Sequence, residues 1–172
     1  YVGYTNSSYF VFIDTDGTVY WIVGDGGAGG AFQSAGVVSI DTWYHFALVR
    51  DGNNLTSYLD GVETATVSMT FNMGYTGTQL TIGSDLGAYG AGGAYFNGYI
   101  SNFRVVDGSA VYTGSFTPPT ELLYPIQNTT LLTCQSSSFI DNSGSNFTLT
   151  RNGDTSVQRF SPFSNVIQTP LS

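Results

Sequence analysis

Short strings of alternating apolar and polar residues, each closed by a tight-turn signal, recur along this 172-residue chain. Successive side chains of a strand point to opposite faces, so such strings are typical of half-buried β-strands. Asp16-Gly17 and Asp60-Gly61 supply clear hairpin turns, because glycine tolerates the positive φ that these turns need. No segment shows a sustained helical period of apolar residues. The pattern predicts an antiparallel all-β fold with roughly nine or ten strands.

The strings that we expect to form strands are residues 9–13, 18–24, 32–40, 43–50, 55–61, 62–71, 79–84, 95–106, 130–135 and 146–153. Aromatic residues make up 15% of the chain and there are 22 glycines, a composition that suits strands joined by many turns. The net charge of −8 and the lack of lysine argue against nucleic acid or an anionic membrane as the main partner. No apolar run is long enough to insert into a membrane.

The run WYHFALVRDGNNLTSYLDGV at residues 43–62 is followed by LTIGS, a glycine-rich loop and FNGYISNFRVV. In order and spacing these motifs resemble laminin G-like domains of the concanavalin A-like superfamily, over about residues 9–106. The resemblance implies an antiparallel two-sheet jelly-roll sandwich. The later strings VYTGSFTPPTELL and LLTCQSSSFIDNSGSNFTLTRNGD are similar in texture to variants found in structural proteins of bacteriophages, especially marine ones.

We expect two parts, a laminin G-like sandwich at residues 1–120 and a strand-forming extension at residues 121–172 that packs on the same or a neighbouring sandwich. Residues 131–153 are similar to the segment that usually opens the fold in the resembled family, yet here they follow the other strands. The missing first strands therefore come either from a longer chain of tandem domains or from another subunit, because an open sheet edge invites pairing.

His45 is the chain's single histidine and the first candidate for chemistry. It shares a strand face with Trp43, Ala47 and Val49, which predicts a partly buried scaffold role. Hydrolases of the resembled superfamily carry Glu-x-Asp-x-x-Glu or a close variant on one strand, whereas Glu63 and Glu121 are this chain's only glutamates. The chain is therefore expected not to be an enzyme.

The loop between residues 85 and 97 is the predicted binding site, because loops on rigid β scaffolds often carry recognition. Tyr89 and Tyr95 would stack on sugar rings, and Asp85 and Asn97 would bond to sugar hydroxyls. The alternative reading is a glycine-rich connector, or a contact in which the tyrosines pack against a neighbouring subunit.

Many domains of the resembled family bind Ca²⁺ at the rim of the sandwich, and the resemblance implies Asp25 and Asp85 as candidate ligands here. Asp14 and Asp16 are a second candidate pair, although a plain turn also explains them. No cofactor other than Ca²⁺ is suggested by the residues.

These features favour a non-enzymatic structural or adhesion module of a virion, in a tail fibre or a capsid-decorating protein, with glycan recognition as an added role. The alternative is a bacterial surface or secreted lectin-like adhesin that binds carbohydrate, with or without Ca²⁺. Other subunits or domains of the same assembly and a cell-surface glycan are the expected partners, and the exposed surface of a virus particle, or of a cell, is the expected location.

Overall fold

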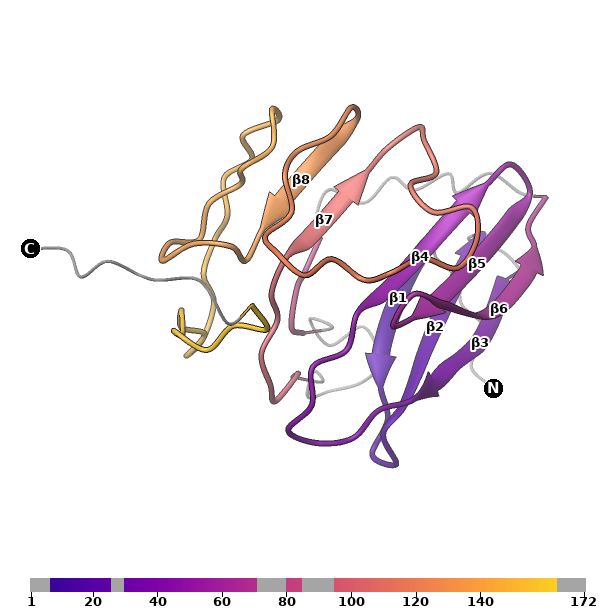
Figure 1. Ribbon diagram of the computed structural model, residues 1–172, viewed down its shortest axis with the longest axis horizontal. Coiled ribbons are helices and arrows are strands. Elements are labelled where there is room, and N and C mark those ends of the chain that lie inside the picture. Colours follow the sequence, from indigo (N-terminus) through magenta and orange to yellow (C-terminus); the bar gives the residue numbers. More distant parts are fainter. Residues whose placement is uncertain (1–6, 26–29, 71–79, 85–94, 164–172) are drawn as a thin grey trace, which may run out of the picture. The chain divides into compact units, whose positions relative to one another are not determined.

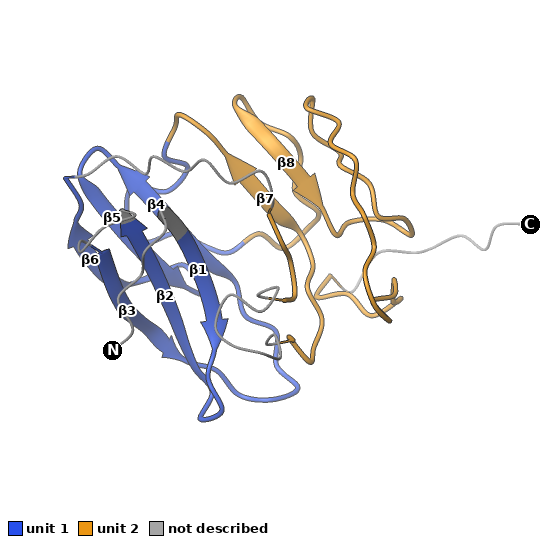
Figure 2. Ribbon diagram, turned by 180° about the vertical axis from the view of Figure 1, so that it is seen from behind, with its two compact units in different colours: residues 1–78, 110–118 blue, residues 79–109, 119–172 orange. Residues whose placement is uncertain are grey.

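The computed structural model describes residues 7–25, 30–70, 80–84 and 95–163, which form eight β-strands, three antiparallel sheets and no helix (Figure 1). The predicted all-β antiparallel class is therefore confirmed. Two compact units divide the chain: residues 1–78 with 110–118, and residues 79–109 with 119–172 (Figure 2). Among the described residues, no helix long and apolar enough to span a bilayer is found.

The first sheet of unit 1 has the order β1-β2-β3, with β1 at Ser7–Ile13, β2 at Thr18–Asp25 and β3 at Gly30–Val37. The predicted hairpin turn at Asp16-Gly17 joins β1 to β2. Gly17 has a φ of 83°, and an Asp16 carboxylate oxygen accepts a 2.8 Å bond from the Thr18 amide. The turn residues Asp16 and Gly17 thus determine where β1 ends and β2 begins.

The second sheet has the order β4-β5-β6, with β4 at Phe46–Asp51, β5 at Asn54–Leu59 and β6 at Val62–Ser68. Its predicted turn at Asp60-Gly61 is present. Asp60 and Gly61 have φ values of 51° and 77°, as a two-residue hairpin loop of the primed type requires. The strands agree with the predicted strings, apart from ends that differ by a few residues.

The core of unit 1 lies between these two sheets. Its buried cluster draws on both of them and consists of Val19, Trp21, Val23, Ala35, Leu55 and Met69. Trp21 is fully buried at its centre. Burial of each such large apolar side chain contributes about 1.5–3 kcal/mol. The two sheets therefore form the face-to-face sandwich that the resemblance to laminin G-like domains implied.

Unit 2 contains β7 at Phe103–Val106 paired with β8 at Thr129–Thr133. β7 is much shorter than the string predicted at 95–106, because Asn102 has a φ of 55°, which does not continue a strand ladder. The string at 79–84 contributes a single bridge, between Ser84 and Tyr95, and the string at 146–153 forms no strand. These parts of the strand prediction are wrong.

Candidate functional site

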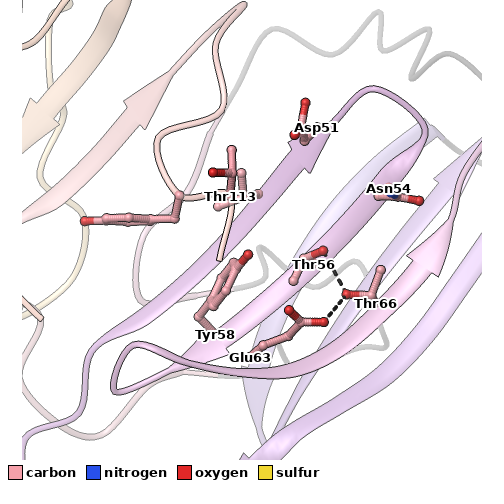
Figure 3. A pocket seen from close by; sticks show the side chains of 9 residues that line it. Asp51, Asn54, Thr56, Tyr58, Glu63, Thr66 and Thr113 are labelled. Carbon is pink, nitrogen blue, oxygen red and sulfur yellow. Dashed lines mark hydrogen bonds between the residues drawn. The ribbon is translucent and has the colours of Figure 1, made fainter. Parts of the chain in front are cut away.

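A polar groove of about 200 Å³ lies on the face of the β4-β5-β6 sheet that points away from the core (Figure 3). The strands supply its floor because residues two apart share a face, so Asn54, Thr56 and Tyr58 of β5 lie in one row. The full lining is Val49, Asp51, Asn54, Thr56, Tyr58, Glu63, Thr66, Tyr112 and Thr113. Hydroxyl, amide and carboxylate groups thus dominate a groove that also has two tyrosines.

Residues 110–118, which we call the strap, form one wall of the groove. The strap is held at Gly61, whose carbonyl accepts a 2.8 Å bond from the Phe116 amide. A side chain at Gly61 would overlap the Phe116 carbonyl oxygen, so only glycine permits this approach. Tyr112 and Phe116 stack with ring centroids 3.5 Å apart, and Tyr58 meets Phe116 edge-on at 5.5 Å. The aromatic wall is therefore built from two distant parts of the sequence.

A bulge between β5 and β6 brings Glu63 to the groove. Ser57 pairs with Ala65 while Tyr58 pairs with Glu63, so one extra residue is inserted in β6. Simple alternation puts Glu63 on the same face as Ala65 and Val67, which pack against the core. The bulge instead places the Glu63 carboxylate beside Thr66, whose hydroxyl donates a 2.8 Å bond to it (Figure 3).

The carboxylates of the groove act on the phenol of Tyr58. Its side chain is only 2% exposed, and burial raises its pKa above the ordinary value. The negative charges of Glu63 and Asp51 raise the pKa further. Tyr58 therefore stays neutral at physiological pH and keeps its hydroxyl proton.

The two carboxylates of the groove come from well-separated strand positions. Asp51 pairs with Asn54 and Glu63 pairs with Tyr58, so their partners lie four residues apart on β5. Four residues of a strand span about 13 Å, whereas hydrolases place their carboxylates about 5–10 Å apart. In the described part of the groove, the arrangement suits binding of a hydroxylated ligand.

His45 lies beside the strap and is half-buried. Its ring meets Phe116 and Tyr112 edge-on, with centroids 5.4 and 6.1 Å away. Its backbone amide donates a 2.8 Å bond to the Asp60 carboxylate, and its carbonyl accepts one from the Asp60 amide. These contacts support the interpretation of His45 as a scaffold residue that holds the strap against the sheet.

The predicted loop site is described only at its end, because Asp85 and Tyr89 lie outside the described residues. Tyr95 is 78% exposed and Asn97 is also exposed, both in unit 2. Glycan binding by this loop stays a prediction.

The predicted Ca²⁺ ligands are not tested either. Asp25 ends β2 but its side chain lies outside the described set, as does the whole of Asp85. Asp14 and Asp16 accept bonds from the amides of Thr15 and Thr18, at 2.7 and 2.8 Å, which are turn contacts. Over the described residues, no three acidic, histidine or cysteine side chains group as metal ligands do.

The groove itself was not among the sites predicted from the sequence, although part of its signal was present. The alternation within residues 54–59 indicates a strand face made of Asn54, Thr56 and Tyr58. Nothing local indicates that Tyr112 lies over that face or that a bulge turns Glu63 toward it. Both depend on long-range register, which a sequence pattern does not specify.

The sequence model of one protein family, described as the concanavalin A-like lectin/glucanases superfamily, matches residues 1–111. Neither the curated proteins nor the solved structures yield a match. The matched range includes both sheets of unit 1 and all of β7. It carries no statement about bacteriophages, so that resemblance stays a prediction. Membership fits a carbohydrate-binding or adhesion-type module, and the chain belongs to the concanavalin A-like lectin/glucanase superfamily.

Proposed function

We propose that this protein is a non-catalytic adhesion module that binds carbohydrate in the groove on the outer face of the β4-β5-β6 sheet. The observation that carries the proposal is the lining of the groove, where hydroxyl, amide and carboxylate groups surround the ring of Tyr112, against which the buried Tyr58 packs edge-on. Sugars present hydroxyl groups for hydrogen bonds and C–H faces for aromatic contact, so this mixture suits them. The wide separation of Asp51 and Glu63 favours binding over hydrolysis.

A glycan array with the full chain tests the proposal. Asn54→Ala removes a groove amide, and we expect affinity for the best array ligand to fall about tenfold, as loss of a good hydrogen bond implies. Asn53→Ala is the matched control, because Asn53 is an exposed turn neighbour that does not line the groove. If no glycan bound, or if both variants lost affinity equally, the groove would not be a carbohydrate site.

The loop of residues 85–97 is the competing location for the same activity. Tyr95 is the described member of that site with a large exposed ring. Tyr95→Ala is expected to leave glycan affinity unchanged if the groove is the site. Loss of binding in Tyr95→Ala and Tyr89→Ala, with Asn54→Ala unaffected, would transfer the activity to the loop. Loss of binding on addition of EDTA would identify a calcium-dependent site there.

The proposed absence of catalysis has its own assay. Incubation of the chain with soluble β-glucans is expected to release no new reducing ends. Measurable hydrolysis, abolished by Glu63→Gln, would instead assign the groove to the glucanase side of the superfamily.

We further propose that the module works within a larger assembly by adding a strand at β1. β1 is the edge of its sheet, and Val11 and Ile13 pair with the core residues Trp21 and Val19, so they share the core-facing side. They are nevertheless 42% and 43% exposed. An edge strand with uncovered apolar side chains is a template for another strand.

The proposed occupant is residues 146–150 of a second copy. This segment forms no strand in unit 2, it alternates Phe147 and Leu149 with threonines, and Phe147 is 58% exposed. The full chain is therefore expected to form oligomers that are lost when residues 131–163 are deleted. A stable monomer at micromolar concentration, with unchanged exposure of β1, would refute this assembly.

The exposed surface of a virus particle is the proposed location, supported by the bacteriophage-like texture of residues 131–153. The alternative is the surface of a bacterial cell, where the same module would act as an adhesin. Antibodies against the full chain separate the two, because electron microscopy would show the label on particles in one case and on cells in the other.

A further inference from the structure

The threonines of the groove floor and the two carboxylates present hydrogen-bond acceptors to a ligand, and we propose that the groove selects sugars without acidic groups and rejects sialylated, sulfated or uronic acid sugars. This inference rests on the proposed function, since it names the ligand class of the same groove. It follows from the direction of the hydrogen bonds on the floor and from the charges of the lining.

The direction of the bonds follows from counting protons. The Thr66 hydroxyl has one proton, and it donates that proton to Glu63 at 2.8 Å. Thr66 must then accept in its 2.9 Å bond with Thr56, so the Thr56 hydroxyl is the donor. Both threonine protons are thereby committed within the floor (Figure 3). What these two residues have left for a ligand is lone pairs.

The carboxylates add to the hydrogen-bond acceptors that face the ligand. Ionised carboxylates only accept, and Asp51 and the second oxygen of Glu63 add further acceptors to the lining. Sugar hydroxyls can donate to all of these atoms. A carboxylate, sulfate or phosphate cannot, and it would leave acceptor facing acceptor at a desolvation cost.

The charge of the groove acts in the same direction. Among the described lining residues there are two carboxylates and no lysine or arginine. The guanidinium of Arg50, on a neighbouring position of β4, is directed to the backbone carbonyls of Gly52 and Met69, at 3.1 and 3.4 Å. An anionic sugar would therefore meet like charges with no cation to offset them, and such juxtaposition suppresses wrong partners.

Matched pairs of oligosaccharides test the inference with the full chain. We expect lactose-type neutral glycans to bind at least about tenfold more tightly than their sialylated or sulfated forms at low salt. The double variant Asp51→Asn with Glu63→Gln is expected to reduce that preference to less than about threefold. The double variant Asp107→Asn with Asp154→Asn is the control, since it changes the net charge equally at exposed positions outside the groove.

Each outcome decides a different point. Tighter binding of acidic glycans by the wild type would overturn the inference and leave the proposed function standing. An equal change in preference for both double variants would also overturn it, because net charge rather than the groove would then select the ligand. No binding of any glycan would overturn the proposed function itself.

Salt dependence provides a second readout on the unmodified chain, in case the groove variants do not fold. Added salt is expected to strengthen binding of acidic glycans and to leave neutral glycans nearly unaffected, since screening removes only the repulsion. A fall in acidic glycan binding with salt would show attraction and contradict the inference.

Discussion

Asp141 shows how much local structure one residue can organise. Its two carboxylate oxygens accept four bonds, from the amides of Leu132, Ser143 and Phe147 and from the Ser143 hydroxyl, at 2.9–3.0 Å. The Asn142 amide also donates to the Leu132 carbonyl at 2.7 Å, so this segment follows the free edge of β8. An acidic side chain here substitutes for part of a strand ladder. Sequence alternation does not reveal such a role.

Asp141→Asn is expected to destabilise unit 2 by about 2 kcal/mol, because an amide group would then face the Ser143 and Phe147 donors. Burial raises the pKa of Asp141, but the four hydrogen bonds outweigh it and lower the pKa below its usual range. The stabilisation is therefore complete above the unfolded value of about 3.9 and is lost as pH falls through the lowered folded value. Urea unfolding followed by circular dichroism between pH 2 and 7 measures both effects. Acid sensitivity unchanged in Asp141→Asn would contradict this account.

Gly61 is the residue that admits the strap. Gly61→Ala is expected to cost more than about 2 kcal/mol, since it strains a positive φ of 77° and drives a methyl group into the Phe116 carbonyl. Gly52→Ala is the matched control: its φ is also positive, at 57°, but no atom lies near the added methyl. Thermal melts compare the two. An equal loss in both variants would show that backbone conformation alone, and not the strap, accounts for the effect.

At the scale of elements, the strands of the two unit 1 sheets and β8 follow the predicted strings, whereas β7 and the strings at 79–84 and 146–153 do not. The β4-β5 hairpin keeps its register because the turn and the apolar face agree, whereas the β5-β6 hairpin changes register at the bulge between Ser57 and Tyr58. β7 begins only at Phe103 because Asn102, the residue before it, has a positive φ, and its side-chain oxygen accepts bonds from the Leu123 amide and the Gln135 side chain. Distant partners, rather than propensity, determine that break.

The edge strand β1 gives a prediction at this scale. Val11→Lys places a charge on the uncovered, core-facing side of β1 and is expected to weaken self-association at least about tenfold, because charged side chains block edge pairing. Val157→Lys is the control, since Val157 in unit 2 is equally exposed, at 41%. Sedimentation velocity over a concentration series measures the difference. Equal association of both variants would exclude β1 as the interface.

At the scale of the whole molecule, the two units differ in the kind of residues that they bury. Unit 1 has a buried apolar cluster around Trp21, whereas the buried residues of unit 2 include Asp141 and Thr133 beside Leu131 and Leu132. Both tryptophans of the chain, Trp21 and Trp43, belong to unit 1. Tryptophan emission therefore reports on that unit.

In a urea titration of Asp141→Asn, the midpoint of the tryptophan emission transition is expected to stay within about 0.3 M urea of the wild-type value. The transition followed by far-ultraviolet circular dichroism is expected to broaden, and its midpoint to move to lower urea concentration. The two probes should coincide more closely in the wild type. An equal downward shift of both probes in Asp141→Asn would show that the units unfold as one.

The sequence by itself determined the all-β class, the hairpin turns at Asp16-Gly17 and Asp60-Gly61, and the superfamily, because these depend on neighbouring residues and their period. The order of residues 54–59 also determined a polar strand face. Only the tertiary structure decided that this face is a groove. The strap reaches it from about fifty residues away in sequence, and a one-residue bulge turns Glu63 from the core side to the ligand side. Register and long-range packing are cooperative properties of the folded chain, and no local pattern specifies them.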